Sequence, residues 1–163
     1  MNTAASDFRL NAGEIAFIQG PVSIVVASCS RDLIPTIVRA AGCRVDAAGC
    51  VTLLVDVNQA RPVIADLEAG GRVAVVFSRP STHRTIQLKG ARARVLGAQE
   101  GDWECVLAYR DAMIGELGGR GYGGDFVRQV LVTEPSSLGA ISFTPSEGFA
   151  QTPGPGAGGA LRR

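Results

Sequence analysis

The sequence lacks the features by which exported, membrane-spanning and zinc-binding chains are usually recognised. Residues 1–18 contain no basic region followed by a long apolar run, so we expect no secretory signal. The most apolar stretch, residues 22–27, is far too short to cross a bilayer. One histidine and four cysteines without a Cys-x-x-Cys pair leave too few ligands for a zinc site. We therefore expect reduced, mostly buried thiols and a cytoplasmic protein.

An excess of charge of either sign is also missing. The chain carries 16 basic and 15 acidic side chains, a net charge of +1, and a charged fraction of 19%. This balance gives no electrostatic reason to expect nucleic acid or an anionic membrane as a partner. The hydrophobic fraction of 46% in 163 residues predicts a sizeable core in one domain spanning residues 1–163, with a Pro/Gly-rich tail at 150–163.

Motifs for nucleophilic catalysis and dinucleotide binding are absent or misplaced. No G-x-S-x-G elbow is present, and His83 has no serine or cysteine motif near it. Asp102 and Glu104 are best interpreted as charges at a helix start. The glycines at 119, 121 and 124 match G-x-G-x-x-G, but they follow one predicted helix and lead to another. The fingerprint requires a preceding strand, so we interpret this segment as a linker.

The chain does contain a series of short strands with helices between them. We predict strands at 21–29, 34–44, 50–57, 72–78, 85–96 and 138–143, and helices at 11–19, 59–69, 103–117 and 125–131. The first three strands follow one another through tight turns, which requires antiparallel pairing. The first strand is almost continuously apolar, as expected when both faces are covered. Asn58 is the predicted cap of the second helix.

One glycine gives further information about the architecture. In the predicted strand at 85–96, Ile86 and Leu88 share one face, whereas Val95 has the other parity. Gly90 lies between them, and a glycine at such a phase change indicates a β-bulge or a barrel corner. The fold class we predict is mainly β with peripheral helices: a split antiparallel β-barrel.

Basic side chains on the second predicted strand are candidates for binding an anion. Arg39 is flanked by apolar residues in that strand, and Arg44 stands at its end. Guanidinium groups form paired hydrogen bonds with phosphate oxygens. The alternative is a solvated strand edge with unpaired charges.

The connection at residues 78–87 is crowded with hydrogen-bonding side chains. A plain hairpin needs only two to four turn residues, whereas this stretch supplies the hydroxyl and amide groups of Ser78, Thr85 and Gln87. Such groups suit a phosphate and a ribityl chain. Three basic residues also predict a local positive patch, namely Arg79, His83 and Arg84. The alternative is an ordinary exposed loop.

The tail is rich in proline and glycine, with the sequence QTPGPGAGG at residues 151–159. Its composition is typical of a flexible tail. Proline pairs stiffen a chain, however, and a stiff segment bearing Gln151 and Thr152 can present N–H groups to an anion or a flat ring. Both interpretations remain open.

Three of these segments resemble a known family. They are IQGPVSIVVASCSRDLIPTIVRAAGCRV, QARPVIADL and, most specifically, VAVVFSRPSTHRTIQLKG. They are similar to the FMN-binding split barrels related to pyridoxamine 5′-phosphate oxidase, over roughly residues 20–96. The resemblance implies a homodimer that holds FMN between its two protomers, with basic residues of the second strand on the phosphate.

The resemblance assigns roles to particular residues. Arg39 matches the first basic residue of the family's R-x-x-x-x-K phosphate motif, and Arg44 occupies the lysine position. Val55 and Asp56 match the strand end whose backbone borders the flavin ring. In the strand matching R-Q-V-R-V-E-G, two residues depart from the family pattern: Thr85 replaces a flavin-contacting glutamine, and Gln87 replaces the next arginine. Ser78 and Gln151 complete the predicted FMN-binding set.

The resemblance leaves the activity open. The oxidase's C-terminal tryptophan and its arginine motif for the vitamin B6 substrate are absent, because Trp103 is the only tryptophan and lies on a predicted helix. We therefore expect an FMN-binding homodimer, a flavin-dependent oxidoreductase of undetermined substrate. The family also includes deazaflavin-dependent enzymes and haem-handling members. The alternatives are a haem protein with His83 as axial ligand and a cofactor-less interaction module.

Overall fold

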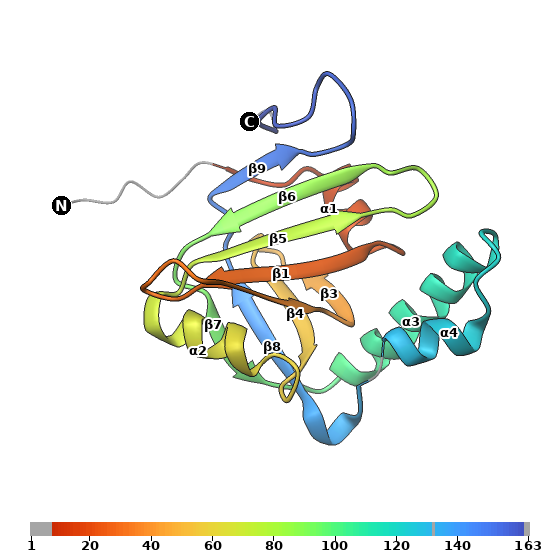
Figure 1. Cartoon of the computed structure of the whole chain (residues 1–163), viewed down its shortest axis with the longest axis horizontal. Helices are drawn as coiled ribbons and strands as arrows, with labels where there is room; N and C mark the ends of the chain where they lie inside the picture. Colours follow the sequence, from red (N-terminus) through yellow and green to blue (C-terminus); the bar gives the residue numbers. More distant parts are fainter. Residues whose placement is uncertain (1–7, 132, 162–163) are drawn as a thin grey trace.

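Two antiparallel sheets form the framework of the molecule. The computed structural model describes residues 8–131 and 133–161. One sheet has five strands in the order β2-β1-β5-β6-β9, and the other has four in the order β3-β4-β8-β7. The strands are β1 (Ser23–Cys29), β2 (Pro35–Arg39), β3 (Gly42–Val45), β4 (Val51–Asp56), β5 (Val73–Ser78), β6 (Thr85–Gly90), β7 (Arg94–Gly97), β8 (Leu138–Phe143) and β9 (Glu147–Ala150). Figure 1 shows strands of the two sheets crossing at a steep angle.

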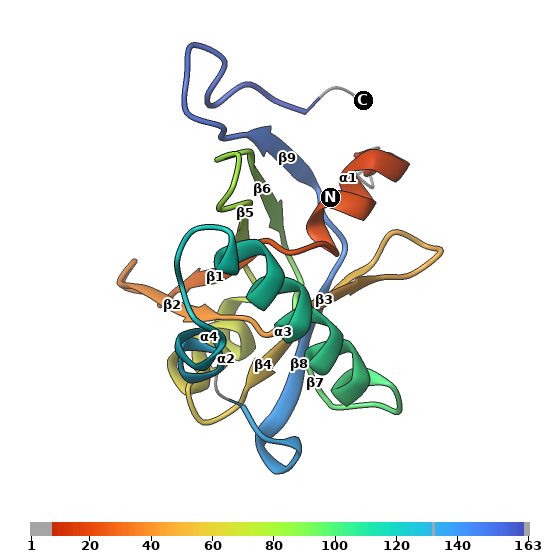
Figure 2. The ribbon, with the colours of Figure 1, turned by 90° about the vertical axis from the view of Figure 1, so that its right-hand side faces the viewer.

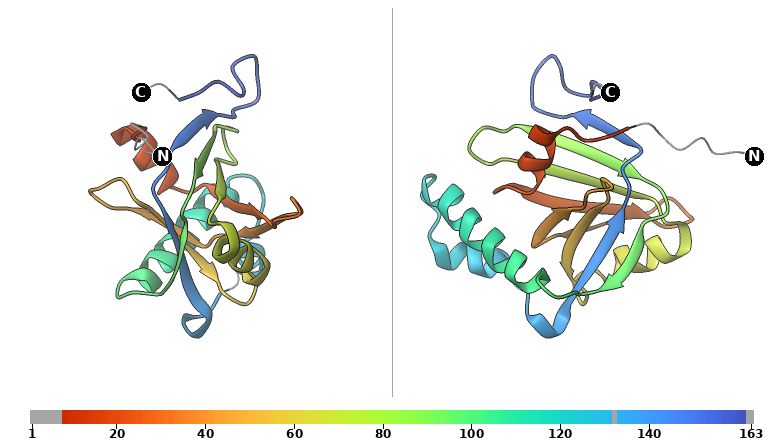
Figure 3. Two further views of the ribbon diagram at one scale, coloured as in Figure 1. Left: turned by 90° about the vertical axis from the view of Figure 1, so that its left-hand side faces the viewer. Right: turned by 180° about the vertical axis from the view of Figure 1, so that it is seen from behind.

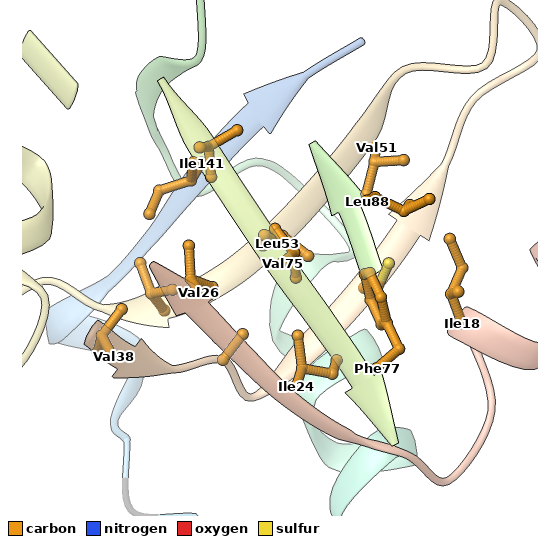
Figure 4. Close-up of a cluster of buried hydrophobic side chains, with 14 of the residues drawn as sticks. Ile18, Ile24, Val26, Val38, Val51, Leu53, Val75, Phe77, Leu88 and Ile141 are labelled. Carbon is orange, nitrogen blue, oxygen red and sulfur yellow. The ribbon is translucent and has the colours of Figure 1, made fainter. Parts of the chain in front are cut away.

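The core lies between the sheets, and its side chains follow the strand period. In β1 and β5 every second residue is buried, because successive side chains point to opposite faces of a strand. Figure 4 shows the resulting cluster. It includes Ile24 and Val26 of β1, Val75 and Phe77 of β5, and Leu53 and Ile141 from the facing sheet, all fully buried. The predicted class, mainly β with peripheral helices in a split barrel, is confirmed.

The predicted strand at 34–44 is two strands, one in each sheet. The Ala40 N–H donates to Ile24 O at 3.0 Å, continuing the pairing of β2 with β1. The next N–H, of Ala41, donates to Leu54 O at 2.7 Å and begins the pairing of β3 with β4. The chain therefore passes from one sheet to the other between these residues. The prediction of a single strand at 34–44 was therefore wrong, and Arg39 and Arg44 lie in different sheets.

The predicted strand at 85–96 divides in the same way, at the place that Gly90 marks. β6 belongs to the five-stranded sheet and β7 to the four-stranded sheet. A Cβ on Gly90 would lie only 2.6 Å from Phe143 Cδ2, so a side chain would disturb this corner. Of the two predicted interpretations of Gly90, a β-bulge or a barrel corner, the structure shows a corner at which the chain passes between the sheets.

Helices lie around the sheets: α1 (Ala12–Ile18), α2 (Arg61–Gly70), α3 (Asp102–Gly118), α4 (Gly124–Val130) and the 3₁₀ turn η1 (Pro135–Ser137). Figure 2 shows α3 and α4 side by side, and the predicted glycine linker joins them. The predicted cap of α2 was wrong, since Ala60 occupies the N-cap position and Asn58 accepts a hydrogen bond from Arg61. No helix among residues 8–131 and 133–161 has the length and apolarity needed to cross a membrane.

The tail is preceded by a ninth strand, β9, that the sequence did not predict. β9 pairs with β6, and the tail then folds back along it. Gly158 N donates to Ala150 O at 2.7 Å, and Leu161 N donates to Gly148 O at 2.8 Å. Between these contacts an exposed loop extends away from the sheets, as both panels of Figure 3 show. The described part of the tail, residues 150–161, is therefore hydrogen-bonded to β9 near both of its ends rather than free along its length.

Candidate functional site

The outer face of the five-stranded sheet carries a mixed row of apolar and polar side chains. Val25 of β1 pairs with Arg39 on one side and with Val76 on the other, and Val76 pairs with Gln87. Partners in an antiparallel register share a face. These side chains alternate with the fully buried ones and point away from the core. The sequence predicted cover on both faces of β1, and in the chain alone the outer face is partly covered, since Val25 is half-buried.

A second row on this face is polar. Ser78 pairs with Ser23 of β1 and with Thr85 of β6, and the Ser78 and Thr85 hydroxyls lie 2.8 Å apart. Gln151 joins the group at the end of β9, where its Nε2 donates to Gln87 Oε1 at 3.4 Å. The structure thus brings together predicted residues that are far apart in the chain, namely Arg39, Ser78, Thr85, Gln87 and Gln151.

Arg39 is an open cation of this face. Its side chain is exposed, and its Nη1 donates to Ser23 Oγ at 2.7 Å. None of the ion pairs between described residues involves it. A guanidinium bonded only to a hydroxyl keeps its full charge and most of its donors for an anion.

Arg44 lies elsewhere and is engaged. Its Nε is 2.8 Å from Asp102 Oδ1, and its Nη2 donates to Gln99 Oε1 at 3.2 Å. The Asp102 side chain is only 2% exposed and its Oδ2 accepts from Gln99 N at 2.8 Å, so Arg44 supplies the charge that neutralises a buried carboxylate. Asp102 does stand in the first turn of α3 as predicted, but it also fastens that helix to β3.

A cleft of about 490 Å³ opens beside Arg39. It lies between the ends of β1 and β2, the β5–β6 connection and helices α3 and α4. Its polar lining includes Ser23, Arg39, His83 and Arg120, and its apolar lining includes Tyr122 and Phe126. None of the described lining residues is acidic. Arg39 and the connection at 78–87, which the sequence proposed as parts of one site, therefore share a cleft.

Glu116 of α3 holds the β5–β6 connection in place. Its carboxylate accepts from Ser81 N at 2.8 Å and from Arg79 Nη2 at 3.2 Å. Burial acts to raise the pKa of Glu116, but the hydrogen bonds from Ser81 and Arg79 and the Arg79 charge outweigh burial, so its pKa lies below the ordinary value. Arg120 adds a hydrogen bond from its Nη2 to Ser81 O. The connection is thus a fixed wall of the cleft.

The predicted positive patch of this connection is dispersed. Arg79 pairs with Glu116, and the Arg84 guanidinium lies 4.3 Å from the centre of the Phe17 ring. Of the three residues only His83 lines the cleft. The cleft's positive charges come from Arg39 and Arg120.

Val55 and Asp56 lie at the end of β4, in the other sheet. Val55 is buried, and its backbone pairs with Gly139 of β8. The Asp56 carboxylate accepts hydrogen bonds from two backbone N–H groups, of Asn58 and Gln59, and from two hydroxyls, of Thr133 and Ser137. These bonds outweigh partial burial and lower the pKa of Asp56. Asp56 lines a small crevice with Arg39, but its side chain is committed to holding the chain around α2 and η1.

Sequence reasoning missed Arg120, Tyr122 and Phe126. They come from the α3–α4 linker and the start of α4, a segment that the pattern identified only as a glycine-rich connection. The available signal was two aromatic residues near glycines, a pattern too common to assign a binding role to the segment. The described residues contain no group of three metal-ligating side chains, and all four cysteines are free.

Comparison with known proteins gives a structural answer only. No protein-family model and no curated protein matches the chain. An F420 reductase structure superposes with a TM-score of 0.55 at 14% identity, covering 85% of this chain and 98% of that one. HupZ from Group A Streptococcus gives 0.54 at 15% identity, covering 91% and 100%. A putative pyridoxamine 5′-phosphate oxidase from Lactobacillus delbrueckii gives 0.55 at 14%, covering 87% and 94%. The chain therefore has the split-barrel fold of the pyridoxamine 5′-phosphate oxidase-like structures.

Proposed function

We propose that this chain is an FMN-binding protein, a flavin-dependent oxidoreductase of undetermined substrate, whose cofactor site is completed by a second copy of the chain. The observation that carries the proposal is the gathering of Arg39, Ser78, Thr85, Gln87 and Gln151 on one sheet face beside an electropositive cleft. These are the groups that a phosphate, a ribityl chain and a flat polar ring require.

The roles divide along the face. Arg39 binds the phosphate, because its exposed guanidinium has no carboxylate partner among the described residues and stands where the sheet face meets the cleft. The Ser78 and Thr85 hydroxyls bind the ribityl chain, and the amides of Gln87 and Gln151 orient the ring over the apolar Val25 and Val76. When bound, FMN itself supplies the hydride and electron transfer. The protein has to bind and orient the ring, which agrees with the lack of a catalytic triad. Arg44 and the Asp56 side chain have no part in this proposal.

A second copy is proposed because the same sheet face continues, at the β1–β2 hairpin, into exposed apolar side chains. Leu33, Ile34 and Ile37, at the tip and edge of the β1–β2 hairpin, are 75%, 63% and 70% exposed. Large aliphatic side chains gathered at such exposure are typical of an interaction surface. A two-fold dimer through this face would cover them and the half-buried Val25 together. Four free cysteines agree with a reducing compartment, so we place the protein in the cytoplasm.

The test is reconstitution of the purified full chain with FMN, followed by removal of free cofactor and an absorption spectrum. We expect a retained flavin spectrum with one FMN per chain, and a dimer by analytical ultracentrifugation. A chain that takes up haem and gives a Soret band instead would favour the haem alternative, with His83 in the cleft as the ligand to test. A chain that retains neither would contradict the proposal and favour the cofactor-less module. Deazaflavin F420 is added in parallel to separate the two flavin types.

A further inference from the structure

The cleft beside Arg39 has a wall that the proposed flavin contacts do not use. The rings of Tyr122 and Phe126 stack, with centroids 5.1 Å apart and planes at 28°. They are 50% and 47% exposed, and Val130 on the same side is 44% exposed. All three line the cleft. A paired aromatic surface left open to water next to a cavity presents a flat apolar platform on which another ring can stack.

The cleft lining also includes a cation, Arg120, and a hydrogen-bonding side chain, His83, and none of its described lining residues is acidic. The nearest carboxylate on this part of α3, Glu116, is occupied by Arg79 and Ser81. Arg120 is exposed and bonds only a backbone carbonyl, that of Ser81, so its charge is not neutralised. A cavity lined by one sign of charge favours a ligand of the opposite sign.

We propose, resting on the proposed function, that this cleft binds the molecule on which the flavin acts, and that this molecule is a flat apolar ring system carrying an anionic group. The ring lies against Tyr122 and Phe126, and the carboxylate, sulfonate or phosphate lies toward Arg120 and His83. Arg39 stands at the junction of the cleft and the sheet face, so the bound molecule is adjacent to the cofactor. The cleft volume of about 490 Å³ fits a fused two- or three-ring molecule.

The test uses two matched probes on the FMN-loaded full chain, 2-naphthoate and its uncharged analogue 2-naphthamide, measured by calorimetry. We expect naphthoate to bind more tightly than naphthamide. Arg120→Gln weakens naphthoate about tenfold and leaves naphthamide unchanged, because only the anion loses a charged partner. Phe126→Ala weakens both probes about tenfold through lost ring contact. Phe126→Leu keeps an apolar side chain and has an intermediate effect, which shows that the loss in Phe126→Ala is not due to misfolding.

The control variants lie on the same helices outside the cleft. Leu107→Ala removes an apolar side chain of α3 that is 41% exposed, and Arg128→Gln removes an exposed arginine of α4 paired with Asp125. Neither changes binding of either probe. Equal losses in the control and cleft variants would overturn the inference. Naphthoate that competes with FMN would overturn it as well and leave the proposed function intact, whereas failure to load FMN would remove both.

Discussion

Arg39 and Arg44 are close in the chain, but the charge of Arg39 is left without a carboxylate partner among the described residues and that of Arg44 is paired. Around Arg39 the sheet face is open, and the guanidinium bonds only the Ser23 hydroxyl. Around Arg44 the junction of β3 and α3 is closed, and the guanidinium is paired with the buried Asp102. The sheet change at Ala40 and Ala41 separates the two regions. An arginine can thus serve binding in one region and folding in the other, and the strand pattern alone does not distinguish them.

The largest effect is expected in the closed region. Arg44→Met leaves Asp102 buried without its cation, and we expect the free energy of unfolding to fall by about 3 kcal/mol, at the lower end for buried pairs because Arg44 is 36% exposed. FMN affinity stays unchanged. Urea denaturation measures the loss. Arg128→Met, which breaks an exposed pair with Asp125, is the control and changes stability by less than about 0.5 kcal/mol. Equal effects of the two variants would contradict the division into regions.

The next effect concerns the apolar part of the open face. Ile37→Asp places a charge where a second copy is proposed to pack, and we expect the dimer dissociation constant to rise about 100-fold with little change in monomer stability. Ile37 is already 70% exposed, so the chain alone loses little. Sedimentation velocity over a concentration series measures the change. Leu107→Asp on α3 is the control. A monomeric parent chain would refute the dimer directly.

Within the open region, Arg39→Ala tests the phosphate. We expect FMN affinity to fall about 30-fold, since a charged hydrogen-bonded contact contributes about 2 kcal/mol. The free energy of unfolding changes by less than about 0.5 kcal/mol, because the residue is exposed. Fluorescence titration of FMN measures the affinity. Arg61→Ala, an exposed arginine on α2, is the control, and unchanged FMN binding in Arg39→Ala would remove the phosphate role.

The smallest effect lies where the cleft wall is fastened. The pKa of Glu116 is lower in the folded chain, so its contribution to stability is complete above its ordinary value of 4.5 and is lost as pH falls through the folded pKa. Glu116→Gln should lower stability by about 1 kcal/mol at neutral pH, with the difference from the parent chain shrinking in acid. Denaturation at a series of pH values measures it. A pH-independent difference would mean that its ion pair with Arg79 contributes nothing.

Much of the fold was predictable because its signals are local. The period-2 pattern marked the strands, tight turns marked both hairpins, and the parity change around Gly90 marked a barrel corner. The structure brings predicted site residues together where they share one sheet face, as Thr85 and Gln87 do. Arg44 and Asp56 lie apart from this face, and the pattern could not show it, because Arg44 pairs with Asp102 and Asp56 also bonds Thr133 and Ser137, all distant in sequence. β9 was missed because a four-residue strand among glycines has little pattern of its own.

The sequence by itself determined the alternation of buried and outward side chains and the glycine corner, because a strand's period and the absence of a Cβ act within a few residues. Tertiary structure alone decided which arginine stays open and which walls enclose the cleft. Asp102, Arg120 and Phe126 reach their places through the packing of α3 and α4 against the sheets, and charge pairing across such distances depends on where the folded chain puts each group.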